Sequence, residues 1–150
     1  KDRMLGAVGN AVPKVYFEET LPLYRAVQTA IENELLLSCH AVTRGGLAVA
    51  LARSAMAGRL GLVLDLDEDE RLRSLTTPAA LFSESTGRFV VTVDPSKIKQ
   101  LEAILPSGSH SLLGVTTPDA MVEVKHRGNK VLQTAVDTLV HAFQETFHAI

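Results

Sequence analysis

Apolar and polar positions recur along this chain with two different periods, and the longer period identifies the helices. Apolar side chains three or four positions apart are typical of a helix with one buried face. Gly58 and Pro95 mark the end of one such stretch and the start of another, since glycine often follows a helix and proline fits a first helical turn. The pattern predicts helices over residues 19–35, 45–57, 96–105 and 134–147, and a short charged helix or loop over 68–75.

Short apolar runs and alternation with a period of two predict the strands. These strands span residues 35–42, 60–67, 88–93, 111–117 and 120–126. Pro118 and Asp119 predict a hairpin turn between the last two strands, and Gly128 and Asn129 predict the tip of a second tight turn over residues 126–132. Helices interspersed with strands and late hairpins predict an α+β fold with a mixed β-sheet flanked by helices.

Length and composition fit one globular domain. The chain has 150 residues, of which 46% are hydrophobic and 21% charged, so it can bury a full core. It opens without Met at "KDRMLGAVGNAVPKV", which is typical of a segment cut from a longer polypeptide. We therefore expect residues 1–18 to be a boundary segment from an upstream domain and residues 19–150 to be a single domain.

Charge and cysteine content exclude several classes of protein. The net charge of −2, with scattered lysines and arginines, argues against nucleic-acid binding. No apolar run reaches the roughly 18 residues of a membrane span. The lone Cys39 cannot form an internal disulfide, which favours a cytoplasmic location. Cys39 is expected to be a buried small hydrophobic residue, with a metal or nucleophile role beside His40 as the alternative.

The first candidate site is the glycine pair in "CHAVTRGGLAVALARSAMAG", residues 39–58, where a strand turns into a helix. Gly45 and Gly46 permit unusual backbone conformations, and the first N–H groups of the following helix lack partners. Such a helix end suits a phosphate, whereas a turn that packs an alanine-rich helix close to a sheet needs no ligand. The absence of a phosphate-loop lysine favours the second interpretation. His40 is either a general base or a structural histidine held by a hydrogen bond.

The second candidate site is "LFSESTGRF", residues 81–89, which crowds polar side chains into a turn before a strand. Glu84 has the oxygens to bind a ribose hydroxyl, an amide or a magnesium-bound water, and Arg88 has the charge to meet a phosphate. The alternative is a polar loop with Gly87 as its turn residue, and spacing alone favours it. The hydrogen-bonding side chains in the turn are Ser83, Glu84, Ser85 and Thr86.

No metal site is expected. The acidic run Asp65–Glu70 lacks the glycine and terminal glutamate of a calcium loop, so it predicts a solvated face. Four further histidines stand isolated, without the spacing of zinc ligands. They are His110, His126, His141 and His148.

Together, residues 39–67 and "LFSESTGRFVVTV" at 81–93 resemble the C-terminal domain of the aminoimidazole ribonucleotide synthetase-like superfamily. Within that superfamily the chain most resembles the phosphoribosylformylglycinamidine synthase family. The typical motifs of that family are His-Asp-x-Ser-x-Gly-Gly-Leu and Leu-Phe-Ser-Glu-Ser-x-Gly-Arg. The opening "MLGAVGNAVPKV" is similar to the boundary after the family's N-terminal, ATP-binding half, and the resemblance covers about residues 4–126.

The resemblance implies roles for the motif residues. Ala41 replaces the family's Asp, Thr43 its Ser, and Arg44 its acidic or polar residue, whereas the second motif is retained. By resemblance, Glu84 and Ser85 bind substrate and this domain holds no catalytic residue. The second motif is similar to that of the second of two family repeats, whose nucleotide site is regarded as structural. The phosphate-contact or motif positions are Ser83, Arg88, Gly45, Gly46 and His40.

The implied activity is that of an ATP-dependent, amidine-forming carbon–nitrogen ligase of purine biosynthesis. ATP would activate an amide oxygen of a formamide-bearing ribonucleotide, and ammonia would then displace the phosphate. This domain would supply a wall of the substrate cleft and an interface, and would be inactive alone.

The implied cofactors, ATP and magnesium, would be bound mainly by an upstream ATP-binding domain of the same polypeptide. The implied partners are that domain, a glutaminase domain or subunit that supplies ammonia, and the ribonucleotide substrate; a homodimer stays open. One alternative is the C-terminal domain of a selenophosphate synthetase or an aminoimidazole ribonucleotide synthetase. Another, favoured by the loss at Ala41, is a non-catalytic structural duplicate.

Overall fold

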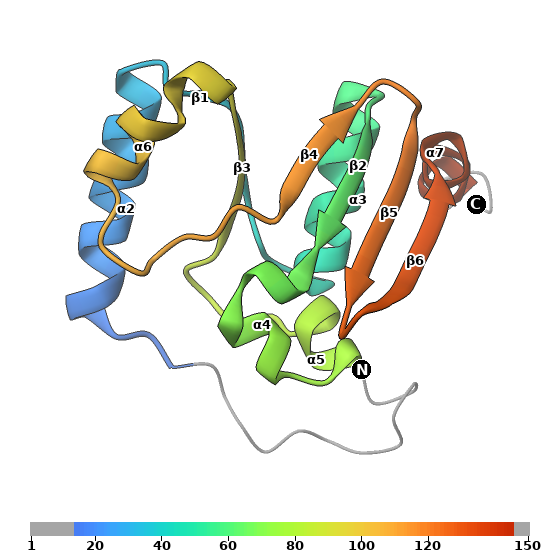
Figure 1. Ribbon diagram of the computed structural model, residues 1–150, viewed down its shortest axis with the longest axis horizontal. Coiled ribbons are helices and arrows are strands. Elements are labelled where there is room, and N and C mark those ends of the chain that lie inside the picture. The colour runs from blue at the N-terminus through green and yellow to red at the C-terminus, as the bar shows by residue number, and fades with distance from the viewer. Residues whose placement is uncertain (1–13, 146–150) are drawn as a thin grey trace.

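The computed structural model describes residues 14–145, which fold into helices and strands that alternate along the chain (Figure 1). Short 3-10 turns, η1 (Leu66–Glu68) and η2 (Pro95–Lys97), follow two of the strands. The helices are α2 (Phe17–Glu32), α3 (Gly46–Gly58), α4 (Glu70–Ser74), α5 (Thr77–Phe82), α6 (Ile98–Ile104) and α7 (Val136–Glu145). The strands are β1 (Leu36–Ala41), β2 (Gly61–Asp65), β3 (Phe89–Val93), β4 (Gly114–Thr117), β5 (Met121–His126) and β6 (Asn129–Ala135).

A four-stranded mixed sheet with the order β4-β2-β5-β6 forms the larger layer. Strand β2 pairs antiparallel with β4 and parallel with β5, and β5 pairs antiparallel with β6. Helix α3 lies behind this sheet and α7 runs beside β6 (Figure 1). The predicted α+β fold with a mixed sheet and flanking helices is therefore confirmed.

The main core lies between α3 and the four-stranded sheet. The alanine-rich face of α3 brings the helix close to strands β2 and β5, whose apolar side chains point at it. Leu66 and Val136, at the ends of η1 and α7, close this core with 0% and 1% of their surface exposed. Its other members include Leu47, Ala50, Leu51, Ala55, Leu62, Leu64, Leu81, Val122 and Val124.

A smaller layer is built from α2, α6 and the antiparallel pair β1 and β3. Its core centres on Ala30, Leu35 and Leu101, against which Val91 and Val93 of β3 pack. Helix α2 begins at Phe17, two residues before the expected start, and buries Ala26 and Ala30. This layer lies beside the larger one (Figure 1). The chain passes from β1 of the smaller layer into α3 of the larger layer.

The predicted hairpin between residues 111–117 and 120–126 is wrong. The strands exist as β4 and β5, but β2 lies between them and pairs with both. Periodicity identifies a strand but not its neighbours, and here a distant strand with buried Leu62 and Leu64 takes the central position. The link holds Ala120 at a φ of 50°, and the hydroxyl of Thr117 donates to the carboxylate of Asp119.

Two further elements differ from expectation. The turn expected over residues 126–132, with Gly128 and Asn129 at its tip, is formed by Arg127 and Gly128, and Asn129 already begins strand β6, which pairs with β5. Helix α5 was not predicted, because its six residues are too few to show a helical period. The helix expected at 134–147 is α7, and residues 146–147 lie outside the described residues.

The expected boundary segment, residues 1–18, lies largely outside the described residues, so the domain limits stay a prediction. Within residues 14–145, none of the helices combines the length and apolar character that crossing a membrane requires.

Cys39 is exposed, which corrects the expectation that it is a buried residue. It lies on β1, a strand of the two-stranded sheet, where few neighbours cover the side chains. Partial desolvation still raises the pKa of its thiol above the ordinary value.

Candidate functional site

The glycine pair forms a left-handed turn that packs the start of α3 against the end of α5. Gly45 and Gly46 have φ angles of 82° and 68°. A Cβ atom on Gly46 would lie 2.7–2.8 Å from backbone atoms of Leu81, Phe82 and Ser83. No side chain fits there, and the geometry therefore agrees with the interpretation of a close-packing turn.

The two motifs meet at the start of α3. The backbone N–H of Gly45 donates to Oε1 of Glu84 over 3.0 Å, although the residues are 39 positions apart. A second link joins the same loops, since the N–H of Val42 donates to the carbonyl of Arg88 over 2.8 Å. The carboxylate therefore occupies the positive end of the helix that a phosphate would otherwise suit.

Arg88 folds back over its own loop. Its guanidinium donates to the carbonyl and Oγ of Ser83 and, from Nε, to the carbonyl of Ser85. Burial lowers the pKa of this half-buried guanidinium from its ordinary value. Gly87 makes the return possible with a φ of 79°, which confirms it as the turn glycine. Arg88 thus holds the loop from inside, and the geometry gives no support to a phosphate contact.

The outward side of the site carries polar groups without partners. Ser85 is exposed, and within residues 14–145 its hydroxyl makes no hydrogen bond. His40 is half-buried on β1 opposite Val90. Its ring also makes no hydrogen bond within the described range, so the expected hydrogen-bonded histidine is not observed. Arg44 and Thr86, which belong to the same two loops, are exposed.

Sequence reasoning missed the contribution of α2 to this site. The ring of Tyr24 meets Phe89 edge to face, with centroids 5.5 Å apart. Its hydroxyl and the side chain of Thr20 both lie about 4.0 Å or less from the position of a Cβ on Gly87. These residues support the back of the loop, and no local pattern in the sequence relates them to it.

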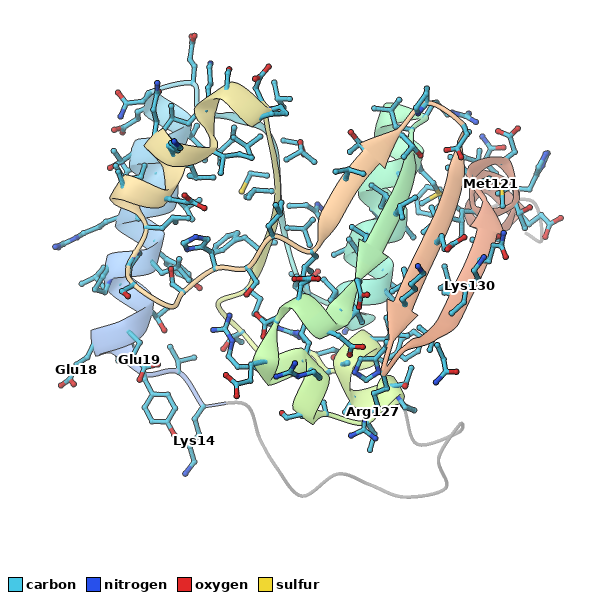
Figure 2. The ribbon with its side chains drawn as sticks, in the orientation of Figure 1. Lys14, Glu18, Glu19, Met121, Arg127 and Lys130 are labelled. Carbon is cyan, nitrogen blue, oxygen red and sulfur yellow. The ribbon has the colours of Figure 1, made fainter. Side chains whose placement is uncertain are left out.

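The acidic run is not the solvated face that was expected. Oδ1 and Oδ2 of Asp67 accept the N–H groups of Arg127 and Gly128, each over 2.9 Å, which lowers the pKa of Asp67. Asp69 is only 6% exposed. It caps α4 through the N–H groups of Arg71 and Leu72, pairs with the Arg71 guanidinium and accepts from the Ser111 hydroxyl. Figure 2 shows Arg127 at the end of β5, beside α4 and α5.

Asp69 is expected to make the fold sensitive to acid. The Arg71 guanidinium is the main cause of a strongly lowered pKa for this carboxyl. Its folded pKa lies below the unfolded value of about 3.9, so its contribution is present above that pH and is lost as pH falls. Asp69→Asn should lose about 2 kcal/mol at neutral pH, by weakening the cap and the ion pair, and show a flatter pH dependence.

Urea unfolding at several pH values measures this effect. Asp137→Asn is the matched control, because its ion pair with Arg59 is exposed and contributes little. If Asp69→Asn and the wild type lost stability in parallel between neutral pH and pH 3, the assigned role of Asp69 would be wrong.

His126 is not isolated, contrary to expectation. Its ring is 1% exposed, with Nδ1 2.9 Å from Oγ1 of Thr77 and Nε2 3.1 Å from the carbonyl of Leu72. Because the carbonyl only accepts, Nε2 donates to Leu72, and Nδ1 shares the second hydrogen bond with the threonine hydroxyl. His126 therefore ties β5 to α4 and α5.

Neither a cluster of three metal-ligating side chains nor an unoccupied helix start at this site is found among the described residues. Within residues 14–145, no three His, Cys, Asp or Glu side chains gather as a metal site would need. The start of α3 already holds Glu84, and Arg88 donates to its own loop. The arrangement can instead present a hydroxyl and a carboxylate oxygen to a ligand.

One protein family and a set of relatives match this chain. The family described as AIR synthase related protein, C-terminal domain, matches residues 2–127. The chain is 34% identical over 122 residues to phosphoribosylformylglycinamidine synthase subunit PurL of Limosilactobacillus reuteri, covering 81% of this chain and 15% of the relative. The same subunit of Thermococcus sibiricus is 27% identical over 132 residues, 88% of this chain and 18% of the relative.

Solved structures share the fold. Thermotoga maritima PurL complexed with FGAR superposes with a TM-score of 0.68 at 21% identity, covering 79% of this chain and 20% of that chain. The structure of PurLQS from Thermotoga maritima gives a TM-score of 0.71 at 22% identity over 92% of this chain and 24% of that chain. The chain thus spans less than a quarter of the length of each of these relatives and structures.

Proposed function

The chain belongs to the family of AIR synthase related proteins, C-terminal domain, and we propose that it is the C-terminal domain of a phosphoribosylformylglycinamidine synthase. The similarity to PurL subunits from several organisms supports the choice of enzyme within the family. The parent enzyme would be an ATP-dependent ligase that converts the amide of the ribonucleotide FGAR into an amidine with ammonia.

The junction of the two motifs at Gly45 and Glu84 is the main support for this proposal. Residues that are far apart in sequence, and that the resemblance marks as family positions, form one polar surface at the start of α3. Ser85 presents its hydroxyl there, and Glu84 has a second carboxylate oxygen without a partner in residues 14–145. We assign this surface to one wall of a cleft for the ribonucleotide, with Ser85 and Glu84 facing it.

The rest of the cleft would come from an upstream domain of the same polypeptide. The short span of the chain on its relatives supports this division. Residues 1–18 would then be the boundary segment and residues 19–150 the domain. Thermotoga maritima PurL has been seen with ATP, and we assign ATP and magnesium mainly to that upstream domain. The glutaminase that supplies ammonia would be a further domain or subunit.

Turnover is expected only when the two domains are together. ATP-dependent amidine formation should be undetectable for the chain alone, because we assign ATP and magnesium mainly to the upstream domain and Glu84 already occupies the start of α3 in this chain. The longer polypeptide that contains the chain should form the amidine from FGAR, ATP, magnesium and ammonium. The assay follows both ADP release and the amidine product.

Each result of this assay has a clear meaning. Amidine formation by the chain alone would refute the division of labour. A longer polypeptide that binds FGAR without turning it over would favour the non-catalytic duplicate to which Ala41 points. Turnover of selenide or of a cyclising ribonucleotide in place of FGAR would identify another superfamily member.

A further inference from the structure

Helix α2 carries two apolar faces, and the described residues bury only one of them. The inner face buries Ala26 and Ala30, and Ala30 belongs to the core of the smaller layer. The outer face presents Phe17, Leu21 and Tyr24, with 78%, 48% and 44% of their surface exposed. These three residues stand at positions i, i+4 and i+7, so they form one stripe along the helix, the outer stripe. A surface helix needs only one apolar face, and a second, exposed one indicates a further contact.

The residues of this surface are typical of an interface. The chain has two tyrosines, and both are here, since Tyr24 lies in the outer stripe and the exposed Tyr16 directly precedes the helix. Aromatic side chains are enriched in interface cores, where they bury a large area at a small cost in side-chain entropy. Figure 2 shows Glu18 and Glu19 at the start of α2 and Lys14 just before it, which gives the stripe a charged rim.

The outer stripe lies next to the candidate site. Tyr24 contacts Phe89, the first residue of the strand that follows the Ser83–Arg88 loop. Cγ2 of Thr20 lies 3.7 Å from the position of a Cβ on Gly87, the turn residue of that loop. A protein surface that covered the stripe would therefore border the same loop.

We propose that the outer stripe of α2 docks in an apolar groove of the upstream domain of the same polypeptide. Anchors at i, i+4 and i+7 are the pattern by which a helix lies in such a groove. The chain spans only 15% and 18% of two PurL relatives, so most of a polypeptide of that length lies outside it. The stripe is on the first described helix, where a short connection to an upstream domain gives a high effective concentration.

The docked helix would hold the two walls of the cleft together. The identity of the partner rests on the proposed function, whereas the presence of a docking stripe on α2 does not. A second copy of the chain is the competing occupant, and the experiments below separate the two.

Hydroxyl-radical footprinting of the chain alone and of the longer polypeptide tests the docking. In the longer polypeptide the modification rates of Phe17 and Tyr24 should fall about fivefold or more, because the centre of an interface is fully buried. Leu112 is the matched control, since it is 64% exposed on the loop before β4, and it should keep its rate. No fall at the stripe, or an equal fall at Leu112, would overturn the proposal.

The double variant Phe17→Ala, Leu21→Ala removes two anchors and spares Tyr24. In the chain alone its Tm should change by less than about 2 °C, because both side chains are exposed. In the longer polypeptide it should return the rate at Tyr24 to that of the chain alone, and Leu112→Ala should not. A larger loss of Tm in the chain alone, or continued protection of Tyr24, would contradict the role of these anchors.

Sedimentation and FGAR turnover distinguish the remaining outcomes. The chain alone should sediment as a monomer at all concentrations. A dimer that Phe17→Ala with Leu21→Ala abolishes would assign the stripe to a second copy and overturn the proposal. Protection of the stripe in a longer polypeptide that does not turn over FGAR would refute the proposed function and leave the docking intact. Turnover without protection would refute the docking alone.

Discussion

Gly46→Ala is expected to lose about 3–5 kcal/mol of folding free energy, from a left-handed residue and from overpacking together. The φ of 68° is costly for any residue with a Cβ. The new methyl group would also lie 2.7–2.8 Å from backbone atoms of α5 and Ser83, which cannot move away as a side chain can. Urea or thermal unfolding measures this loss.

Gly108→Ala is the matched control for this prediction. Gly108 has nearly the same φ, 69°, but no atom lies within 4 Å of the position of its Cβ. It should therefore lose only the conformational part, about 1–2 kcal/mol. Equal losses for the two variants would show that α3 does not pack against α5 as closely as described.

His126→Ala should lose about 3 kcal/mol, since it opens a cavity and leaves two polar groups unpaired. The ring is almost fully buried and bonds both Thr77 and the carbonyl of Leu72. Loss of the ring should loosen α4 and α5 first, and α5 carries the backbone on which Gly46 packs. Thermal unfolding gives the loss, and hydrogen exchange of α5 amides locates it.

Two other variants isolate the cause of the His126 effect. Thr77→Val keeps the shape of the side chain and removes one hydrogen bond, so it should lose about 1 kcal/mol. His110→Ala should change stability by less than about 0.5 kcal/mol, because its ring is partly exposed and 3.9 Å from Glu102. A loss for His126→Ala no larger than for His110→Ala would contradict the assigned role.

Sequence patterns identified elements but not their partners. The run at residues 88–93 predicted β3 almost to the residue, because β-branched side chains carry that signal locally. The pairing of β2 with both β4 and β5 could not be predicted, because the order of strands in a sheet depends on packing between distant segments. Leu62 and Leu64 of β2 are buried in the core shared with α3, and β2 lies between β4 and β5. Tight turns were easier, and Gly87 and Gly128 both have the positive φ that was expected of turn residues.

The family could be predicted from two short motifs, and the match over residues 2–127 confirms it. Their meeting in space could not be predicted, because the bond between Gly45 and Glu84 joins loops that no spacing rule relates. The same reason explains Asp67 and Asp69. A run of acidic residues by itself indicates a solvated face. In the structure a distant turn, at Arg127 and Gly128, supplies the N–H groups that Asp67 accepts.

We propose that the Ser83–Arg88 loop, which is hydrogen-bonded to the start of α3, is one wall of a ribonucleotide cleft that a neighbouring domain completes. Calorimetric titration with FGAR tests it most directly, on the chain alone, on the longer polypeptide and on its Ser85→Ala variant. We predict no binding by the chain alone, binding by the longer polypeptide, and about tenfold weaker binding without the Ser85 hydroxyl. Equal affinity of the folded Ser85→Ala variant and the wild type, or full affinity of the chain alone, would contradict the account.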